Sequence, residues 1–251
     1  MSLALGSCVP SSIPRGGWSA GKGIYLTLLG GFQLRRDGNV VILPLPAERL
    51  LAFVALRNRP LLRPYIAGAL WSDATEGHAA GNLRCALWKL THCGARLLEG
   101  SGGHLELSPD VSVDIRLGSA LALRLRDAAP VPAAELTADN LSFDLLPDWY
   151  EEWVILEREA FCQLRVHALE SLCERLVEVG KFGPAVQAGL AAVTADPLRE
   201  SAHRILIAAY LAEGNAGPAL RQFETFSRLL EDELGLEPSV AMQALARRLR
   251  R

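Results

Sequence analysis

Apolar residues near the start of the chain come in short runs that turn-forming residues separate. Gly30-Gly31 and Asp37-Gly38-Asn39 lie between segments that are rich in β-branched and aliphatic residues. This pattern predicts short antiparallel strands at residues 24–29, 32–34 and 40–43. Pro44 and Pro46 end the last strand, and Pro46 also suits the first turn of a helix.

After these runs the apolar spacing becomes helical, with apolar residues three or four positions apart. The period predicts three helices, at residues 47–56, 64–71 and 78–93. We expect the third helix to face the core with Ala80, Leu83, Leu87 and Leu90. A hairpin of residues 97–99 and 104–107 around Gly102-Gly103, and a strand at residues 111–113, follow. The order of sheet, three helices and hairpin predicts an α+β N-terminal part.

The remainder of the chain has helical spacing. A helix is predicted at residues 116–127, followed by a loop with three prolines at residues 128–147. The helix predicted from Pro147 to Val179 is long enough to bend or break. Trp149 and Trp153 are four residues apart, so they share a helix face and are expected to anchor the core.

One short motif occurs twice in the helical part. Gly180, Gly183, Pro184 and Ala185 recur 34 residues later as Gly214, Gly217, Pro218 and Ala219. A period of 34 residues is that of tetratricopeptide (TPR) helix pairs. The spacing therefore predicts an all-α, TPR-like C-terminal part, and two similar helical hairpins without a true repeat are the alternative.

Charge divides the chain into two unlike parts. The 251 residues carry a formal net charge of −2, but residues 1–115 carry +3 and residues 116–251 carry −5. A mildly positive N-terminal part is compatible with nucleic-acid binding without demonstrating it. The hydrophobic fraction of 50% excludes a disordered chain.

Targeting signals and disulfides are not predicted. No apolar run approaches the roughly 20 residues that span a bilayer, and Leu3-Ala4-Leu5 is too short for a secretory signal, so we expect a cytoplasmic protein without a membrane partner. The Ser-, Gly- and Pro-rich residues 1–23 predict a flexible arm. The five Cys include no CxxC pair and are expected to be reduced thiols.

Candidate catalytic and cofactor motifs are incomplete. Residues 16–23 come within one residue of a phosphate-binding P-loop, but Gly23 stands where a Ser or Thr must hold magnesium. Cys85, His92 and Cys93 lack the spacing of metal ligands. Because GxSxG and HExxH are also missing from the sequence, we expect neither an enzyme nor a bound cofactor or metal.

The third predicted helix carries an unusual polar face. Opposite its apolar side lie Cys85, Trp88, Lys89 and His92, with Arg84 at the flank. No acidic residue occurs between Gly77 and Arg96, so this face can approach an anionic groove. The alternative is a short amphipathic helix with a partly buried Trp88.

Phrases along most of residues 24–248 resemble the SARP family of bacterial transcriptional activators. In the N-terminal part the matching phrases are Leu28-Leu29-Gly30-Gly31-Phe32, residues 49–56, Leu70-Trp71-Ser72-Asp73 and Asn82-Leu83-Arg84. In the C-terminal part they resemble the bacterial transcriptional activator domain: Trp149, Trp153-Val154, Glu157-Arg158, Pro197-Leu198-Arg199-Glu200, Ala209-Tyr210 and residues 230–238. Each phrase is weak alone, but their order across two parts is specific.

The resemblance implies an architecture and a function. It implies an OmpR-type winged helix-turn-helix at residues 24–115 and a TPR-like activator domain at residues 116–251, after the arm of residues 1–23. It further implies binding of direct-repeat double-stranded DNA by head-to-tail protomers and recruitment of RNA polymerase through its sigma subunit. The chain departs from the family at Thr91, where Arg is usual, and at Trp88, where a small polar residue is expected.

We therefore predict a sequence-specific DNA-binding transcriptional regulator of the activator type. The candidate DNA-contacting residues are Arg84, Trp88, Lys89, Thr91, His92 and Arg96. The main alternative is a helical-repeat interaction adaptor whose winged-helix part binds DNA weakly or not at all. Thr91 and the low positive charge favour the adaptor, whereas the acid-free helix favours DNA binding.

Overall fold

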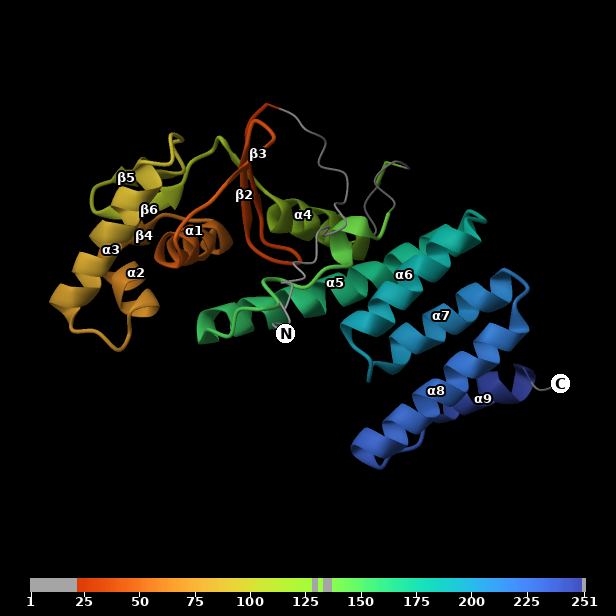
Figure 1. Cartoon of the computed structure of the whole chain (residues 1–251). Helices are drawn as coiled ribbons and strands as arrows, with labels where there is room; N and C mark the ends of the chain where they lie inside the picture. The colour runs from red at the N-terminus through yellow and green to blue at the C-terminus, as the bar shows by residue number, and fades with distance from the viewer. Residues whose placement is uncertain (1–21, 128–130, 133–136, 250–251) are drawn as a thin grey trace, which may run out of the picture.

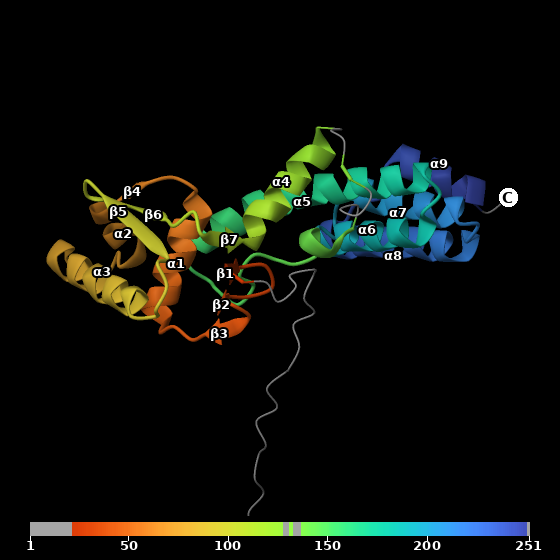
Figure 2. The ribbon, with the colours of Figure 1, turned by 90° about the horizontal axis from the view of Figure 1, so that it is seen from above.

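The molecule is elongated, with a mixed α/β part at one end and a stack of helices at the other. The computed structural model describes residues 22–127, 131–132 and 137–249. Figures 1 and 2 show the small sheets and three helices at one end, and the helix α5 running from there into the helical stack. This arrangement confirms the predicted fold class, an α+β winged helix-turn-helix followed by an all-α TPR-like part. Most of the predicted flexible arm lies outside the described residues.

The first sheet has the order β3-β2-β1-β7. Strands β1 (Ile24–Thr27), β2 (Gln33–Arg36) and β3 (Asn39–Val41) pair antiparallel, as the sequence predicts. Their turns contain Gly30, Gly31 and Gly38, which adopt the positive φ angles that glycine tolerates best. Strand β7 (Val111–Val113) joins this sheet parallel to β1. The sequence predicted the strand β7 but not this pairing.

Three helices and a second small sheet complete the winged helix-turn-helix. Helices α1 (Leu45–Arg57), α2 (Arg63–Leu70) and α3 (Glu76–Thr91) begin and end within three residues of their predicted positions. The hairpin of β5 (Leu98–Ser101) and β6 (His104–Leu107) pairs through β6 with β4 (Leu61–Leu62). The two-residue strand β4 was not predicted, because its pairing depends on a strand that lies far along the chain.

The core-facing side of α3 differs slightly from the prediction. Its buried residues are Ala79, Leu83, Ala86 and Leu90, whereas the expected Ala80 and Leu87 are half-buried. The observed residues follow the helical spacing of four, three and four more closely. The helix is therefore turned slightly about its axis relative to the prediction, and its predicted polar face is exposed.

Helices α4 and α5 connect the two parts. Helix α4 (Asp114–Arg126) starts directly after β7, and a 3-10 turn, η1 (Asp139–Leu141), lies within the predicted loop. Helix α5 (Glu152–Glu178) is one unbroken helix of 27 residues. Its start falls after the predicted Pro147, because the chain turns at Leu146, whose φ is 43°, and the Trp149 N–H donates to the Leu146 carbonyl.

The two ends of α5 belong to different hydrophobic cores. Trp153, Val154 and Phe161 pack in the core of the winged helix-turn-helix, whereas Leu169 and Leu172 pack in the core of the helical stack. The Trp153 ring stacks edge-on against Phe53 of α1 at 5.2 Å and against Trp149 at 6.2 Å. Trp153 thus anchors the core as predicted, and Trp149 packs against it from a half-buried position.

The helical stack repeats its turn geometry. Helices α6 (Phe182–Ala195) and α8 (Ala216–Leu234) start 34 residues apart, and each follows a glycine with positive φ, 74° at Gly180 and 89° at Gly214. After each glycine, the next N–H donates to a carbonyl of the preceding helix over 2.8 Å, from Lys181 to Leu176 and from Asn215 to Tyr210. Pro184 and Pro218 are the third residues of their helices. The predicted 34-residue period therefore appears in the backbone.

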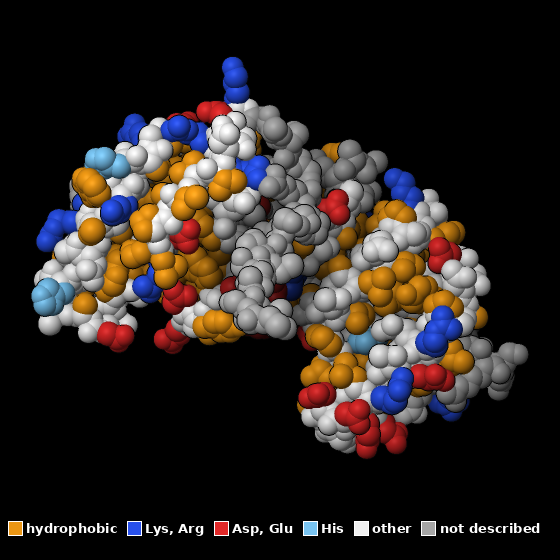
Figure 3. Space-filling model, in the orientation of Figure 1, with side chains coloured by type: hydrophobic (Ala, Val, Ile, Leu, Met, Phe, Trp, Pro, Cys, Tyr) orange, Lys and Arg blue, Asp and Glu red, His pale blue; other side chains and the backbone are white. Residues whose placement is uncertain are grey.

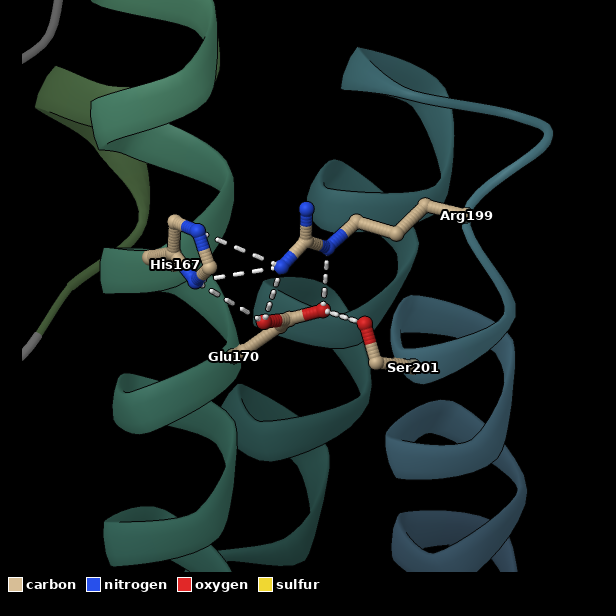
Figure 4. Close-up of polar contacts among 4 residues, drawn as sticks. All are labelled: His167, Glu170, Arg199 and Ser201. Atoms are coloured by element: carbon tan, nitrogen blue, oxygen red, sulfur yellow. Dashed lines mark hydrogen bonds and ion pairs between the residues drawn. The ribbon is translucent and has the colours of Figure 1, made fainter.

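Helix α7 (Glu200–Ala212) follows α6, and helix α9 (Val240–Leu249) follows α8 and completes the helical stack. A polar cluster around the buried Glu170 ties the start of α7 to α5 (Figure 4). The Glu170 carboxylate accepts hydrogen bonds from Arg199 Nε at 2.8 Å and from Ser201 Oγ at 2.5 Å. His167 lies on the other side of the Arg199 guanidinium, with Nδ1 at 3.1 Å. The cluster fixes the α6–α7 connection against the long helix.

Among the described residues, no helix combines the length and the apolar character that a membrane span requires.

Candidate nucleic-acid interface

The exposed face of α3 carries the residues that the sequence singled out. Arg84, Trp88, Lys89, Thr91 and His92 are all exposed. They stand on the side opposite the buried Leu83 and Leu90, because helical positions four apart share a face. The structure therefore brings the candidate residues of this helix onto one continuous surface.

Trp88 is held in place although 54% of it is exposed. Its ring lies 4.1 Å from the His92 ring, centroid to centroid, and the Lys89 ammonium lies 5.0 Å from its centroid. Such a cation over an indole face is attracted by the ring electrons. The side chain is therefore not a core residue, and its contacts with His92 and Lys89 leave about half of it exposed.

The last turn of α3 is closed by side chains. The Trp88 carbonyl accepts a hydrogen bond from Thr91 Oγ1 at 2.8 Å, and His92 Nδ1 lies 2.7 Å from the same oxygen. These contacts add to a backbone hydrogen bond, because the His92 N–H also donates to this oxygen at 3.3 Å. The Thr91 hydroxyl thus points back to the helix end, unlike the long cationic side chain that the family resemblance would put there.

A groove of about 630 Å³ runs between α3 and the β5–β6 hairpin. Three guanidinium side chains line it, from Arg63, Arg84 and Arg96, together with Trp88 and several leucines. None of the described residues that line it is acidic. Arg96 is exposed and loosely paired with Glu99 at 3.5 Å. The groove therefore presents positive charge over an apolar floor.

Arg63 is the site residue that sequence reasoning missed. It is the first residue of α2 and reaches the hairpin because Gly100 leaves room for it: a Cβ at Gly100 would lie 3.2 Å from Arg63 Nη2. No local pattern marks this approach, since it depends on how α2 lies against the hairpin. Arg36 has a structural role that the sequence did not predict. Its Nη1 donates to the Gly94 carbonyl at 2.6 Å and holds the turn after α3.

The hairpin tip that forms the wing carries no cationic side chain. Its residues are Ser101, Gly102, Gly103 and His104, and both glycines have positive φ angles. Backbone N–H groups, the Ser101 hydroxyl and His104 are thus the polar groups that this tip offers. The positive charge near α3 comes from the helix and the groove instead.

Other chemistry finds little support among the described residues. No group of three His, Cys, Asp or Glu residues is arranged to hold a metal ion in the described ranges. Cys85, Cys93, Cys162 and Cys173 are free thiols, and burial raises the pKa of Cys173 to about 12. Most of the P-loop-like segment, residues 16–23, lies outside the described residues.

Comparison with known proteins identifies the family. The sequence model of the family described as "Bacterial transcriptional activator domain" matches residues 119–250, more than half of the chain. The chain belongs to this family of SARP-type transcriptional activators. The SARP resemblance is thereby confirmed, and the family is one of transcription regulators rather than of enzymes.

Two curated relatives of this SARP-type chain are regulators from Streptomyces. The chain is 27% identical over 241 residues to the regulatory protein AfsR of Streptomyces coelicolor, covering 88% of the chain and 24% of that protein. It is 24% identical over 240 residues to AfsR of Streptomyces griseus, covering 91% of the chain and 24% of that protein. The chain therefore spans about a quarter of the length of these relatives.

A solved structure has the same fold as the SARP-type chain. It is EmbR of Mycobacterium tuberculosis in complex with a low-affinity phosphopeptide, with a TM-score of 0.67 and 23% sequence identity. The match covers 92% of this chain and 65% of that one. At this identity the likeness establishes the arrangement of the fold alone.

The family phrases in the helical part have structural roles. Arg199 pairs with Glu170 of α5, and the neighbouring Glu200 accepts a hydrogen bond from the Ser239 N–H at 2.8 Å, just before α9. Arg158 donates to the carbonyls of Leu145 at 2.8 Å and Trp149 at 2.7 Å. These residues hold neighbouring helices and turns together, so they explain the fold and not a binding site.

Proposed function

We propose that the chain is a sequence-specific DNA-binding transcriptional regulator that acts as an activator in the cytoplasm. The observation that carries this proposal is the exposed face of α3, which has no acidic residue after Glu76 in the first turn and continues into a groove lined by three arginines. An α-helix fits the major groove of duplex DNA, and a wing contacts the adjacent backbone or minor groove. Cationic groups at such a surface supply the salt-dependent part of the affinity.

We assign the DNA contacts to Arg84, Trp88, Lys89, His92 and Arg96, with Arg63 added from the structure. Thr91 remains among the proposed contacts through its position, although its hydroxyl already bonds to the Trp88 carbonyl. The absence of Arg at position 91 removes one cation from this surface. Losing one such contact typically costs about 1–3 kcal/mol of binding free energy. We propose that Arg63, at the start of the neighbouring helix α2, supplies the missing cation.

We further propose a division of labour between residues 24–115, which bind DNA, and residues 116–251, which mediate self-association or contact with RNA polymerase through its sigma subunit. Protomers bound head to tail on direct repeats would contact DNA through the first part and each other or the polymerase through the second. The opposite net charges of the two parts support this division, and Figure 3 shows acidic side chains gathered at the end of α8. The acidic residues there are Glu231, Asp232, Glu233 and Glu237, and all are exposed.

The test is footprinting of the full chain on DNA flanking its own gene, at several salt concentrations. We expect protected sites whose affinity falls steeply with salt, because phosphate contacts release counterions. Lys89→Ala should weaken binding and reduce the salt slope by about one. Lys181→Ala is the matched control, since Lys181 is an exposed lysine at the start of α6. Equal binding by both variants would place the DNA surface elsewhere.

The adaptor function remains the second candidate, favoured by Thr91 and by exposed apolar side chains at the acidic end of α8. Leu234, Leu236 and Val240 are 52%, 55% and 77% exposed there. A chain that protects no DNA at low salt yet binds purified RNA polymerase would support the adaptor. Protected DNA that Lys89→Ala loses would support the regulator.

A further inference from the structure

Trp88 is a large apolar side chain in a position that a DNA-reading helix normally fills with polar groups. It is 54% exposed, and it lines the groove beside Arg84. A tryptophan with most of its side chain exposed is uncommon, because burying its large apolar ring lowers the free energy of the protein. Its ring therefore leaves accessible apolar area at the centre of the proposed DNA surface.

The indole is presented in a fixed position. The His92 ring lies against it at 4.1 Å and the Lys89 ammonium at 5.0 Å. His92 is itself fixed, because its Nδ1 lies 2.7 Å from the Trp88 carbonyl. A ring held in this way loses little conformational entropy when it contacts a partner, so its contact can discriminate between partners.

The groups around Trp88 limit which base edge fits there. The indole offers an apolar face and one N–H donor, and its neighbours Arg84 and Lys89 are donors without an acceptor. Cytosine presents an amino donor in the major groove, for which Trp88, Arg84 and Lys89 offer no acceptor. The Thr91 hydroxyl and His92 Nδ1 are turned toward the Trp88 carbonyl instead. Guanine presents acceptors but no apolar group, and adenine presents one acceptor and one donor. Thymine alone combines an acceptor with a methyl group.

We propose that Trp88 determines part of the DNA sequence that the chain reads, by packing against the 5-methyl group of a thymine in the major groove. The proposal rests on the proposed DNA-binding function and adds a base preference to it. Arg84 and Lys89 then bind neighbouring acceptors or phosphates. The chain thereby recognises a thymine-containing half-site.

The experiment starts with duplexes that the full chain enriches from a random library. Each thymine of an enriched duplex is then replaced singly by deoxyuridine, which removes the methyl group and leaves base pairing unchanged. We expect one thymine in each half-site at which the replacement raises Kd roughly fourfold, the effect of losing the burial of about one methyl group. Trp88→Ala should abolish the difference between the two duplexes, whereas Trp88→Phe, which keeps an apolar ring, should retain it.

Tyr150→Ala is the control variant, because Tyr150 is an aromatic residue 79% exposed outside α3. It should distinguish thymine from deoxyuridine as the unaltered chain does. If no deoxyuridine substitution changes Kd, or if Trp88→Ala shows the same change, the inference is overturned while DNA binding stands. If the unaltered chain enriches no duplex at all, both the inference and the proposed function are overturned.

Discussion

Asp114 joins two segments of the winged helix-turn-helix through a single carboxylate. It is 8% exposed and accepts hydrogen bonds from the backbone N–H groups of Leu28 at 2.9 Å, Leu29 at 2.9 Å and Ile115 at 2.7 Å. These groups belong to the end of β1 and the start of α4. An amide in this place would offer one acceptor oxygen and would turn its NH2 group toward a backbone donor.

Asp114→Asn should therefore lower the free energy of unfolding by about 1–3 kcal/mol, the cost of leaving a buried donor unsatisfied. Denaturant-induced unfolding measures this change. Asp110→Asn is the control, since Asp110 is exposed in the preceding turn and should change stability by less than about 0.5 kcal/mol. Equal stability of the two variants would show that the three hydrogen bonds contribute little.

The same carboxyl should make stability depend on pH. Burial raises the pKa of Asp114 from 3.8 to about 6, against the opposing effect of its backbone donors. Between these values the folded chain holds a proton that the unfolded chain has lost. This contribution to stability, about 3 kcal/mol, is therefore complete below pH 4 and is lost as the pH rises through 6.

Unfolding of the unaltered chain and of Asp114→Asn, compared from pH 4 to pH 7.5, measures this effect. The stability of the unaltered chain relative to the variant should decrease with rising pH. A difference that grows with pH would instead mean that the backbone donors outweigh burial and lower the pKa.

The candidate site could be predicted only as far as it lies on one helix. The helical period was enough to place Arg84, Trp88, Lys89 and His92 on one exposed face. The groove and Arg63 could not be predicted, because they depend on how α2 approaches the hairpin at Gly100. The turn of the Thr91 hydroxyl toward the helix end is likewise set by local geometry that residue type does not determine.

Helix α6 approaches α7 closely at Gly189. A Cβ on Gly189 would lie 3.1 to 3.2 Å from Leu206, including its backbone Cα. Ala favours helices over Gly by about 1 kcal/mol, but here α7 would have to shift to make room. Gly189→Ala should therefore be destabilising, by about 1–3 kcal/mol.

Thermal unfolding followed by circular dichroism checks this prediction. Gly183→Ala is the matched control in the first turn of the same helix, where nothing lies within 4 Å of the added Cβ. It should be neutral or slightly stabilising. A stabilising effect of both changes would mean that α6 and α7 can separate without cost.

The elements themselves followed from the sequence where their signals are local. The strands, the hairpin and the paired turns at Gly180 and Gly214 are specified by glycines and by apolar spacing within a few residues. The parallel pairing of β7 with β1, and the strand β4, depend on segments far apart in the chain. Whether α5 would break was equally undetermined, because its continuity depends on the two cores that it enters.

At the scale of the whole molecule, Trp153 connects the two parts. It is 9% exposed and packs edge-on against Phe53, although it belongs to the helix that enters the helical stack. Ion pairs continue the contact, between Arg57 and Glu157 at 2.6 Å and between Arg49 and Glu151 at 2.8 Å. We therefore expect the chain to unfold as one cooperative unit rather than as two separate domains.

Trp153→Ala should lower the free energy of unfolding by about 3–5 kcal/mol and separate the unfolding of the two parts. Trp153→Phe keeps an aromatic ring against Phe53 and removes an indole N–H that has no hydrogen-bond partner, so it should cost less. Calorimetry decides between one transition and two. Two transitions in the unaltered chain would contradict the expected coupling.

The continuity of α5 also sets a rotational phase between its ends. Each residue of an α-helix adds about 100° of rotation and about 1.5 Å of length. One residue inserted between Phe161 and Ala168 would therefore swing the helical stack around the winged helix-turn-helix, whereas a residue inserted between Gly102 and Gly103 at the hairpin tip would leave that angle unchanged. Sites one DNA turn apart present their bound protomers on the same side of the duplex. On direct repeats bound as we propose, the residue count of α5 would set the azimuth at which neighbouring helical stacks face each other.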